Sequence, residues 1–191
     1  MRAPLGGSEM RRAALLLRAP HDWLGIARFG LSAGPRDARP LVQGVVEGEA
    51  GVLLALRREL RGWELPGGRA EPGEDEKSAL VRELREETGL AVEPLERVGE
   101  YRRRGFAAHR ARVYRCRVVG GALRPSADTP AVAWFRPEAL PDTLFPWFRT
   151  PLLDALVGTT LPVEREETLG PTAIAAGLWI DLRSRWRREG A

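Results

Sequence analysis

The stretch GRAEPGEDEKSALVRELREETGL, from Gly68 to Leu90, decides the fold of this 191-residue chain. It begins with a glycine turn and then places its apolar residues on one side, which predicts an amphipathic helix from Glu74 to Thr88. Acidic residues at the start suit the positive end of the helix dipole, and Gly89 is the expected C-terminal stop. Leu80 and Leu84 are expected to face a core.

The glutamates of this predicted helix lie together on its other side. An α-helix turns about 100° per residue, so Glu76, Glu83, Glu86 and Glu87 fall in one arc about 100° wide. Like charges at this spacing destabilise a helix by about 0.2–0.5 kcal/mol per pair, and a counter-ion is the economical explanation. Grouped carboxylates suit Mg²⁺ or Mn²⁺. The alternative is a solvent-exposed acidic helix balanced by nearby arginines.

The same stretch resembles the Nudix box, the family pattern G-x5-E-x7-R-E-U-x-E-E-x-G-U, in which U is a bulky apolar residue. Every defined position is matched, by Gly68, Glu74, Arg82, Glu83, Leu84, Glu86, Glu87, Gly89 and Leu90. The preceding WELPGG, residues 63–68, resembles the usual family approach to the box. The resemblance covers roughly residues 40–157 and implies an α/β fold, an α/β/α sandwich with a mixed sheet.

This resemblance implies a Mg²⁺-dependent hydrolase. Its substrate would be a nucleoside di- or triphosphate, or a nucleoside diphosphate linked to another group, cleaved at a diphosphate bond. The implied metal ligands are Glu83, Glu86, Glu87 and the carbonyl of Gly67. Glu83, Glu86 and Arg82 are the implied catalytic residues, and Arg82 is expected to orient the glutamates because a guanidinium does not lose its proton.

The sequence does not decide which residue acts as the general base. Many family members carry a later glutamate three residues before a tryptophan, where this chain has Ala131 before Trp134. Asp128 is the best substitute, Glu83 itself is another candidate, and Glu100 is a weaker one. A plain role for Asp128 in starting a turn is an equal alternative.

The sequence gives fewer indications of which residues contact the substrate. The resemblance favours Arg57, at the end of a predicted strand, as a phosphate ligand. Trp63 and Gly68 are further candidates for substrate binding, although aromatic residues at such places are more often part of the core. The arginines at 102–104 either meet phosphates or lie in a solvated turn.

Two other classes of function remain as alternatives. A Nudix-like regulator that binds a nucleotide without cleaving it usually lacks box glutamates, and these are intact here. An RNA-end pyrophosphohydrolase would gain support from an extended basic surface, but the net charge is only +4, so we expect no nucleic-acid partner.

Composition and hydrophobic patterning give the domain organisation. The chain is 43% hydrophobic and 29% charged, enough for a packed core, and we predict an extension at 1–38, the Nudix domain at 39–157 and a C-terminal extension at 158–191. Cys116 is the only cysteine, which excludes an internal disulfide and favours a reducing, cytoplasmic setting. The sequence has no apolar run long enough to cross a membrane.

The remaining elements follow from local patterns. Strands are expected at residues 41–47, 52–57, 63–65, 92–101, 108–119 and 131–135. A short helix is expected from Glu9 to Arg18, ended by Pro20, with further helices at 145–157 and 172–188. The last helix either packs on its own domain or pairs with a second subunit, so a homodimer is one expectation.

Overall fold

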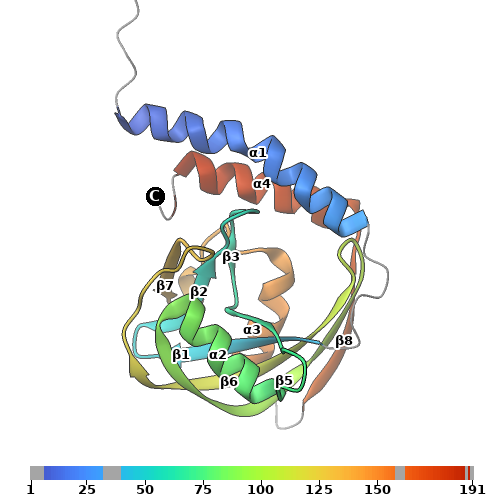
Figure 1. Cartoon of the computed structure of the whole chain (residues 1–191). Coiled ribbons are helices and arrows are strands. Elements are labelled where there is room, and N and C mark those ends of the chain that lie inside the picture. Colours follow the sequence, from blue (N-terminus) through green and yellow to red (C-terminus); the bar gives the residue numbers. More distant parts are fainter. Residues whose placement is uncertain (1–6, 32–39, 158–161, 188, 190–191) are drawn as a thin grey trace, which may run out of the picture.

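A computed structural model describes residues 7–31, 40–157, 162–187 and 189 of the chain (Figure 1). Its strands are β1 (Leu41–Gly48), β2 (Gly51–Leu56), β3 (Trp63–Glu64), β4 (Gly67–Arg69), β5 (Leu90–Gly105), β6 (His109–Gly121), β7 (Ala131–Phe135) and β8 (Val163–Leu169). Its helices are α1 (Gly7–Leu31), α2 (Glu76–Thr88), α3 (Arg149–Val157) and α4 (Pro171–Arg187), with 3-10 turns η1 (Pro137–Ala139) and η2 (Pro146–Phe148).

The strands form one mixed sheet in the order β3-β2-β1-β6-β5-β8, with β4 also paired to β1 and β7 to β2. The pairs β1–β6 and β5–β8 are parallel, and the other pairs are antiparallel. Successive residues of a strand point to opposite faces. Val45 accordingly packs in the core that contains Leu152 of α3, and Val46 packs in the core that contains Leu84 of α2. The α/β/α sandwich expected from the family resemblance is confirmed.

The central helix α2 forms where the sequence predicts it, apart from its first residues. Asp75 is the N-cap and accepts the backbone N–H groups of Lys77 and Ser78 at 3.0 and 3.1 Å, so the helix starts at Glu76 instead of Glu74. Gly89 ends it in the left-handed conformation, with φ of 76°. Leu80 and Leu84 are fully buried, as expected.

The N-terminal helix α1 contradicts the predicted stop at Pro20, because it continues without a break to Leu31. A proline inside a helix removes one backbone hydrogen bond and crowds the preceding turn. Contacts with α4 offset this cost: Trp23 Nε1 donates to Asp181 Oδ2 at 2.8 Å, and Arg185 Nη2 donates to Asp22 Oδ2 at 2.9 Å. Both acceptor–donor pairs involve residues that follow Pro20 in α1, so tertiary packing extends the helix beyond its local signal.

Replacing Pro20 with alanine should therefore stabilise the protein. Pro20 is exposed and makes the interior of α1 less favourable, so the change should raise the free energy of unfolding by about 1–3 kcal/mol in urea denaturation. Pro171→Ala is the matched control, because Pro171 occupies the first position of α4, where proline is tolerated. Equal effects of the two substitutions would contradict the continuous α1.

The edge strand β8 has no counterpart among the predicted elements. Its sequence VEREETL is mostly charged, and it forms a strand by pairing in parallel with β5. The arginines at 102–104 lie on β5 and pair with carboxylates of β8, so the expected solvated turn is wrong. Contact of these arginines with phosphates stays a prediction. The ion pairs are Arg102–Glu164, Arg103–Glu167 and Arg104–Glu166, at 3.3, 3.0 and 2.8 Å.

The last helix, α4, lies beside α1 in the same chain (Figure 1). Its buried side is largely polar: Asp181 and Arg185 are 0% and 1% exposed, and their side chains are 2.8 Å apart. Asp181 Oδ1 also accepts the backbone N–H of Arg61 at 2.7 Å, which ties α4 to the loop between β2 and β3. Packing within the chain thus occupies this face of α4, and pairing with a second subunit stays a prediction.

Two further expectations concern the chain as a whole. The predicted domain limit at 38/39 falls within residues 32–39 and the limit at 157/158 borders residues 158–161, both of which lie outside the described residues. Within the described ranges, no helix is both long and apolar enough to span a bilayer.

Candidate active site

Two glutamates of α2 approach the same glycine segment. Glu87 Oε2 accepts the backbone N–H of Gly67 at 2.9 Å. Gly68 lies against the carboxylate of Glu83, because a methyl group added at Gly68 would come within 2.3 Å of the carboxyl carbon of Glu83. The structure therefore brings together four of the predicted site residues at the start of β4.

Arg82 holds the acidic side chains around it. Its Nε and Nη2 donate to the two carboxylate oxygens of Glu74 at 3.0 and 2.9 Å, and its Nη1 donates to Glu83 at 3.1 Å. These hydrogen bonds from Arg82 lower the pKa of Glu74. Glu86 is more loosely held, at 3.5 Å from Arg82, and its side chain is 61% exposed. Arg82 thus holds Glu83 in position through a hydrogen bond to one carboxylate oxygen.

Glu76 shares the predicted acidic arc but binds elsewhere. Its carboxylate accepts the hydroxyl of Tyr114 at 2.8 Å and also pairs with Arg112, both on β6. Glu76 therefore joins α2 to the sheet and is not part of the carboxylate cluster at the glycine segment.

Glu64 is the site candidate that sequence reasoning missed. It lies on β3, its side chain is 15% exposed, and its Oε2 is 3.3 Å from Nη1 of Arg57. Burial raises the pKa of Glu64 more than Arg57 lowers it. Burial and the negative charge of Glu64 then raise the pKa of Glu87 to about 8. The only signal in the sequence was an acidic residue between apolar Trp63 and Leu65, directly before the glycines.

The carboxylates at the glycine segment fit a divalent cation without forming a complete cage. In the described part of the chain, no three acidic, histidine or cysteine side chains are already grouped to hold a metal ion. Burial raises the pKa of both Glu83 and Glu87, so their negative charges are poorly compensated. Mg²⁺ often takes only one or two carboxylates and completes its shell with water and substrate phosphate. Glu83 and Glu87 suit that mode of binding.

Three other candidates from the sequence lie outside this cluster. Asp128 has a side chain that is 92% exposed and faces Nη1 of Arg58 at 3.8 Å. Trp63 is 6% exposed and packs edge-to-face on Phe135. It is therefore a core residue and offers no open ring face on which a base could stack. Glu100 is buried, yet hydrogen bonds from arginines of β5 and β6 lower its pKa, which makes it a poor base.

Gly68→Ala should separate catalysis from folding. The backbone at Gly68 accepts alanine, but the new methyl group would displace the carboxylate of Glu83. A shift of about 1 Å in such a group can lower the rate about 100-fold, and we expect kcat/KM to fall by that order with little change in melting temperature. Gly120→Ala on β6 is the control, because its nearest neighbour would be 4.0 Å away. A fully active Gly68→Ala protein would exclude Glu83 from the reaction.

Comparisons with known proteins agree with this geometry. The family model of the NUDIX domain matches residues 37–156. A MutT-like protein of Streptomyces ambofaciens is 42% identical over 120 residues, covering 61% of this chain and 76% of the relative. A protein of Bacillus subtilis named putative 8-oxo-dGTP diphosphatase is 34% identical over 95 residues, covering 50% of this chain and 64% of the relative.

The fold also matches a solved structure. The crystal structure of a NUDIX hydrolase from Nitrosomonas europaea has a TM-score of 0.62 at 21% identity, covering 71% of this chain and 81% of that one. The box residues, their convergence on a glycine segment and the matched family model lead to one assignment. The chain belongs to the Nudix hydrolase family and is a pyrophosphohydrolase.

Proposed function

We propose that this enzyme hydrolyses a diphosphate bond in a nucleoside di- or triphosphate, or in a nucleoside diphosphate linked to another group, with Mg²⁺ as cofactor and Mn²⁺ as a substitute. The observation that carries the proposal is the convergence of Glu83 and Glu87, both with raised pKa, on Gly67 and Gly68. The name of the Bacillus subtilis relative supports a nucleotide as substrate.

The protein's own groups have distinct tasks in this reaction. Glu83 and Glu87 would hold the cation, with Glu86 and the carbonyl of Gly67 as further ligands proposed from the family. When bound, the cation neutralises charge on the phosphoryl oxygens and makes water a better nucleophile. Arg57 is 48% exposed, so its guanidinium remains accessible to a substrate phosphate.

For the general base, the surroundings of Glu83 support it better than those of Asp128. Arg82 and the backbone of Gly68 fix the position of Glu83, and its side chain is 18% exposed. A base must lie within hydrogen-bond reach of the water that it activates. The side chain of Asp128 is 92% exposed and is only loosely paired with Arg58, at 3.8 Å, so its position is not fixed in this way.

Three broader expectations stay as proposals. We propose residues 39–157 as the catalytic domain, a cytoplasmic location, and no nucleic-acid partner. Homodimer formation would need a surface other than the side of α4 that faces α1.

The test is product analysis with a panel of substrates in Mg²⁺, with Glu83→Gln beside the native protein. The panel contains nucleoside triphosphates, oxidised nucleoside triphosphates, ADP-ribose, nucleotide sugars and triphosphorylated RNA. Activity on one substrate group that disappears in Glu83→Gln supports the proposal. Nucleotide binding without any cleavage would favour the regulator alternative, and cleavage of RNA alone would favour the RNA-end enzyme.

A further inference from the structure

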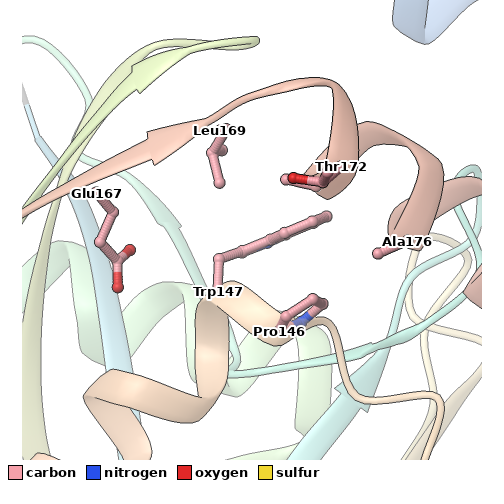
Figure 2. A pocket seen from close by; sticks show the side chains of 7 residues that line it. Pro146, Trp147, Glu167, Leu169, Thr172 and Ala176 are labelled. Atoms are coloured by element: carbon pink, nitrogen blue, oxygen red, sulfur yellow. The ribbon is translucent and has the colours of Figure 1, made fainter.

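A pocket of about 350 Å³ lies where the C-terminal extension meets the Nudix domain (Figure 2). This volume is within the range of small-molecule sites. Its lining residues come from η2, β8 and α4: Pro146, Trp147, Glu167, Leu169, Thr172, Ala173 and Ala176. The NUDIX family model ends at residue 156, so one wall of the pocket consists of residues outside the matched domain.

Trp147 offers the pocket an aromatic face. Phe145 stacks on the indole with ring centres 4.7 Å apart and planes 9° apart, so it covers one face of the ring. Figure 2 shows the indole edge-on, with Leu169 and Thr172 on one side of its plane and Pro146 on the other. Gly177 lets α4 come close to the ring, because a methyl group there would lie 3.2 Å from it. The ring is thus fixed, and a flat heterocycle can stack on the face that Phe145 leaves open.

Glu167 is the charged group of the pocket, and Arg103 holds it in place. Nε of Arg103 donates to Oε2 of Glu167 at 3.0 Å, and Nη2 of Arg103 donates to the carbonyl of Trp147 at 2.5 Å. The Arg103 side chain is 1% exposed, so this link is buried. An ionised carboxylate only accepts hydrogen bonds, and each oxygen can accept two. A ligand beside Glu167 must therefore present N–H or O–H donors.

Arg103 also connects the pocket with the carboxylate cluster of the active site. Its Nη1 donates to Nε2 of His109 at 3.2 Å, which leaves Nδ1–H of His109 to donate to the carbonyl of Ala107 at 2.7 Å. The charge of Arg103 reaches Glu64, whose pKa it helps to lower against the larger effect of burial. Glu64 pairs with Arg57, the proposed phosphate ligand. Charged side chains therefore link the pocket to the proposed diphosphate site. Glu167 binds Arg103, the charge of Arg103 acts on Glu64, and Glu64 pairs with Arg57.

We propose that this pocket binds the nucleobase of the substrate, stacked on Trp147, and that Glu167 selects a base with two adjacent donors, as guanine has. Guanine presents N1–H and N2–H side by side, whereas adenine and cytosine place an acceptor nitrogen beside their amino group, which a carboxylate repels. The inference rests on the proposed function, because it assigns the base end of the nucleotide whose diphosphate lies at Glu83 and Glu87.

Calorimetric titration of the full chain with GMP, AMP and CMP, without divalent cation, tests the site independently of hydrolysis. GMP should bind at least about 10-fold more tightly than AMP or CMP, since a bidentate pair contributes about 1–3 kcal/mol of discrimination. Trp147→Leu should weaken GMP binding about 10-fold, as expected for the loss of one stacking platform. Trp179→Leu is its control, because Trp179 is 63% exposed on α4 and does not line the pocket.

Glu167→Gln should remove the preference for GMP over AMP and CMP. Glu166→Gln is the matched control, since Glu166 lies on the same strand, is 53% exposed and pairs with Arg104. Native protein gives a test that needs no variant: kcat/KM for GTP should exceed that for ITP, which lacks the N2 amino group, about 5-fold or more.

The outcomes distinguish the two proposals. Equal binding of GMP, AMP and CMP, or GMP binding that Trp147→Leu leaves unchanged, would overturn the base pocket even if the enzyme cleaves nucleotides. Selective GMP binding that depends on Trp147, in a protein that cleaves no member of the panel, would support the pocket and overturn the proposed function instead.

Discussion

Glu87→Gln is expected to lower kcat/KM roughly 1,000-fold, near the upper end of the effect of removing one electrostatic stabiliser from an active site. The substitution keeps the size of the side chain but removes the negative charge that would hold the cation. Glu87 also accepts the N–H of Gly67, and the amide oxygen of glutamine can still do so. The fold should therefore survive, and the loss should come from the chemistry.

The same variant should be at least as stable as the native protein without divalent cation. The pKa of Glu87 rises from 4.5 to about 8 on folding, because of burial and the charge of Glu64. As pH rises from about 5 to about 8, the unfolded chain releases this proton while the folded protein keeps it, so native stability falls with rising pH. Glutamine does not titrate, and this component of the pH dependence should disappear in Glu87→Gln.

Urea denaturation in EDTA at pH 5, 6, 7 and 8 measures the effect, with Glu96→Gln as control. Glu96 is 57% exposed and pairs with Arg115 on the sheet, so its removal should change activity and stability little. Mg²⁺ should raise the melting temperature of the native protein more than that of Glu87→Gln. Identical pH slopes and identical Mg²⁺ shifts in the two proteins would refute this role for Glu87.

Asp181→Ala should have the largest effect on stability, lowering the free energy of unfolding by about 3–5 kcal/mol. Asp181 is fully buried, and its loss leaves the buried guanidinium of Arg185 with Asp22 as its remaining ion-pair partner. The substitution also removes the acceptors for the indole N–H of Trp23 and the backbone N–H of Arg61. One side chain thus holds α1, α4 and the loop between β2 and β3 together.

Asp142→Ala is the matched control, because Asp142 also pairs with arginines of α4 but at the surface. Its oxygens lie 2.6 Å from both Arg183 and Arg187, and its side chain is 48% exposed. Exposed ion pairs contribute about 0–1 kcal/mol, so this change should be small in the same denaturation experiment. If the two variants lost equal stability, the buried network would not be what fixes the terminal helices.

The sequence by itself determined the catalytic helix and its surroundings. The box pattern with its cap residues Asp75 and Gly89 specifies α2 through contacts within a few residues. Two short apolar-rich stretches with Gly48 and Gly51 between them specify the hairpin of β1 and β2. The box pattern, with the glycine before it, also names Glu83, Glu87, Gly67 and Gly68 as residues of one site, but the contact of Gly67 with Glu87 spans 20 residues and forms while β4 pairs with β1.

Only the tertiary structure decided the parts that depend on distant partners. The course of α1 past Pro20 depends on α4, more than a hundred residues away, and β8 becomes a strand because β5 supplies its hydrogen bonds and arginines. No single segment encodes how deeply a side chain is buried. Packing of the whole chain made Trp63 a core residue and raised the pKa of Glu64 through burial, whereas Asp128 stays exposed. Short-range patterns fix an element, whereas its charge state and exposure arise only when the whole chain packs.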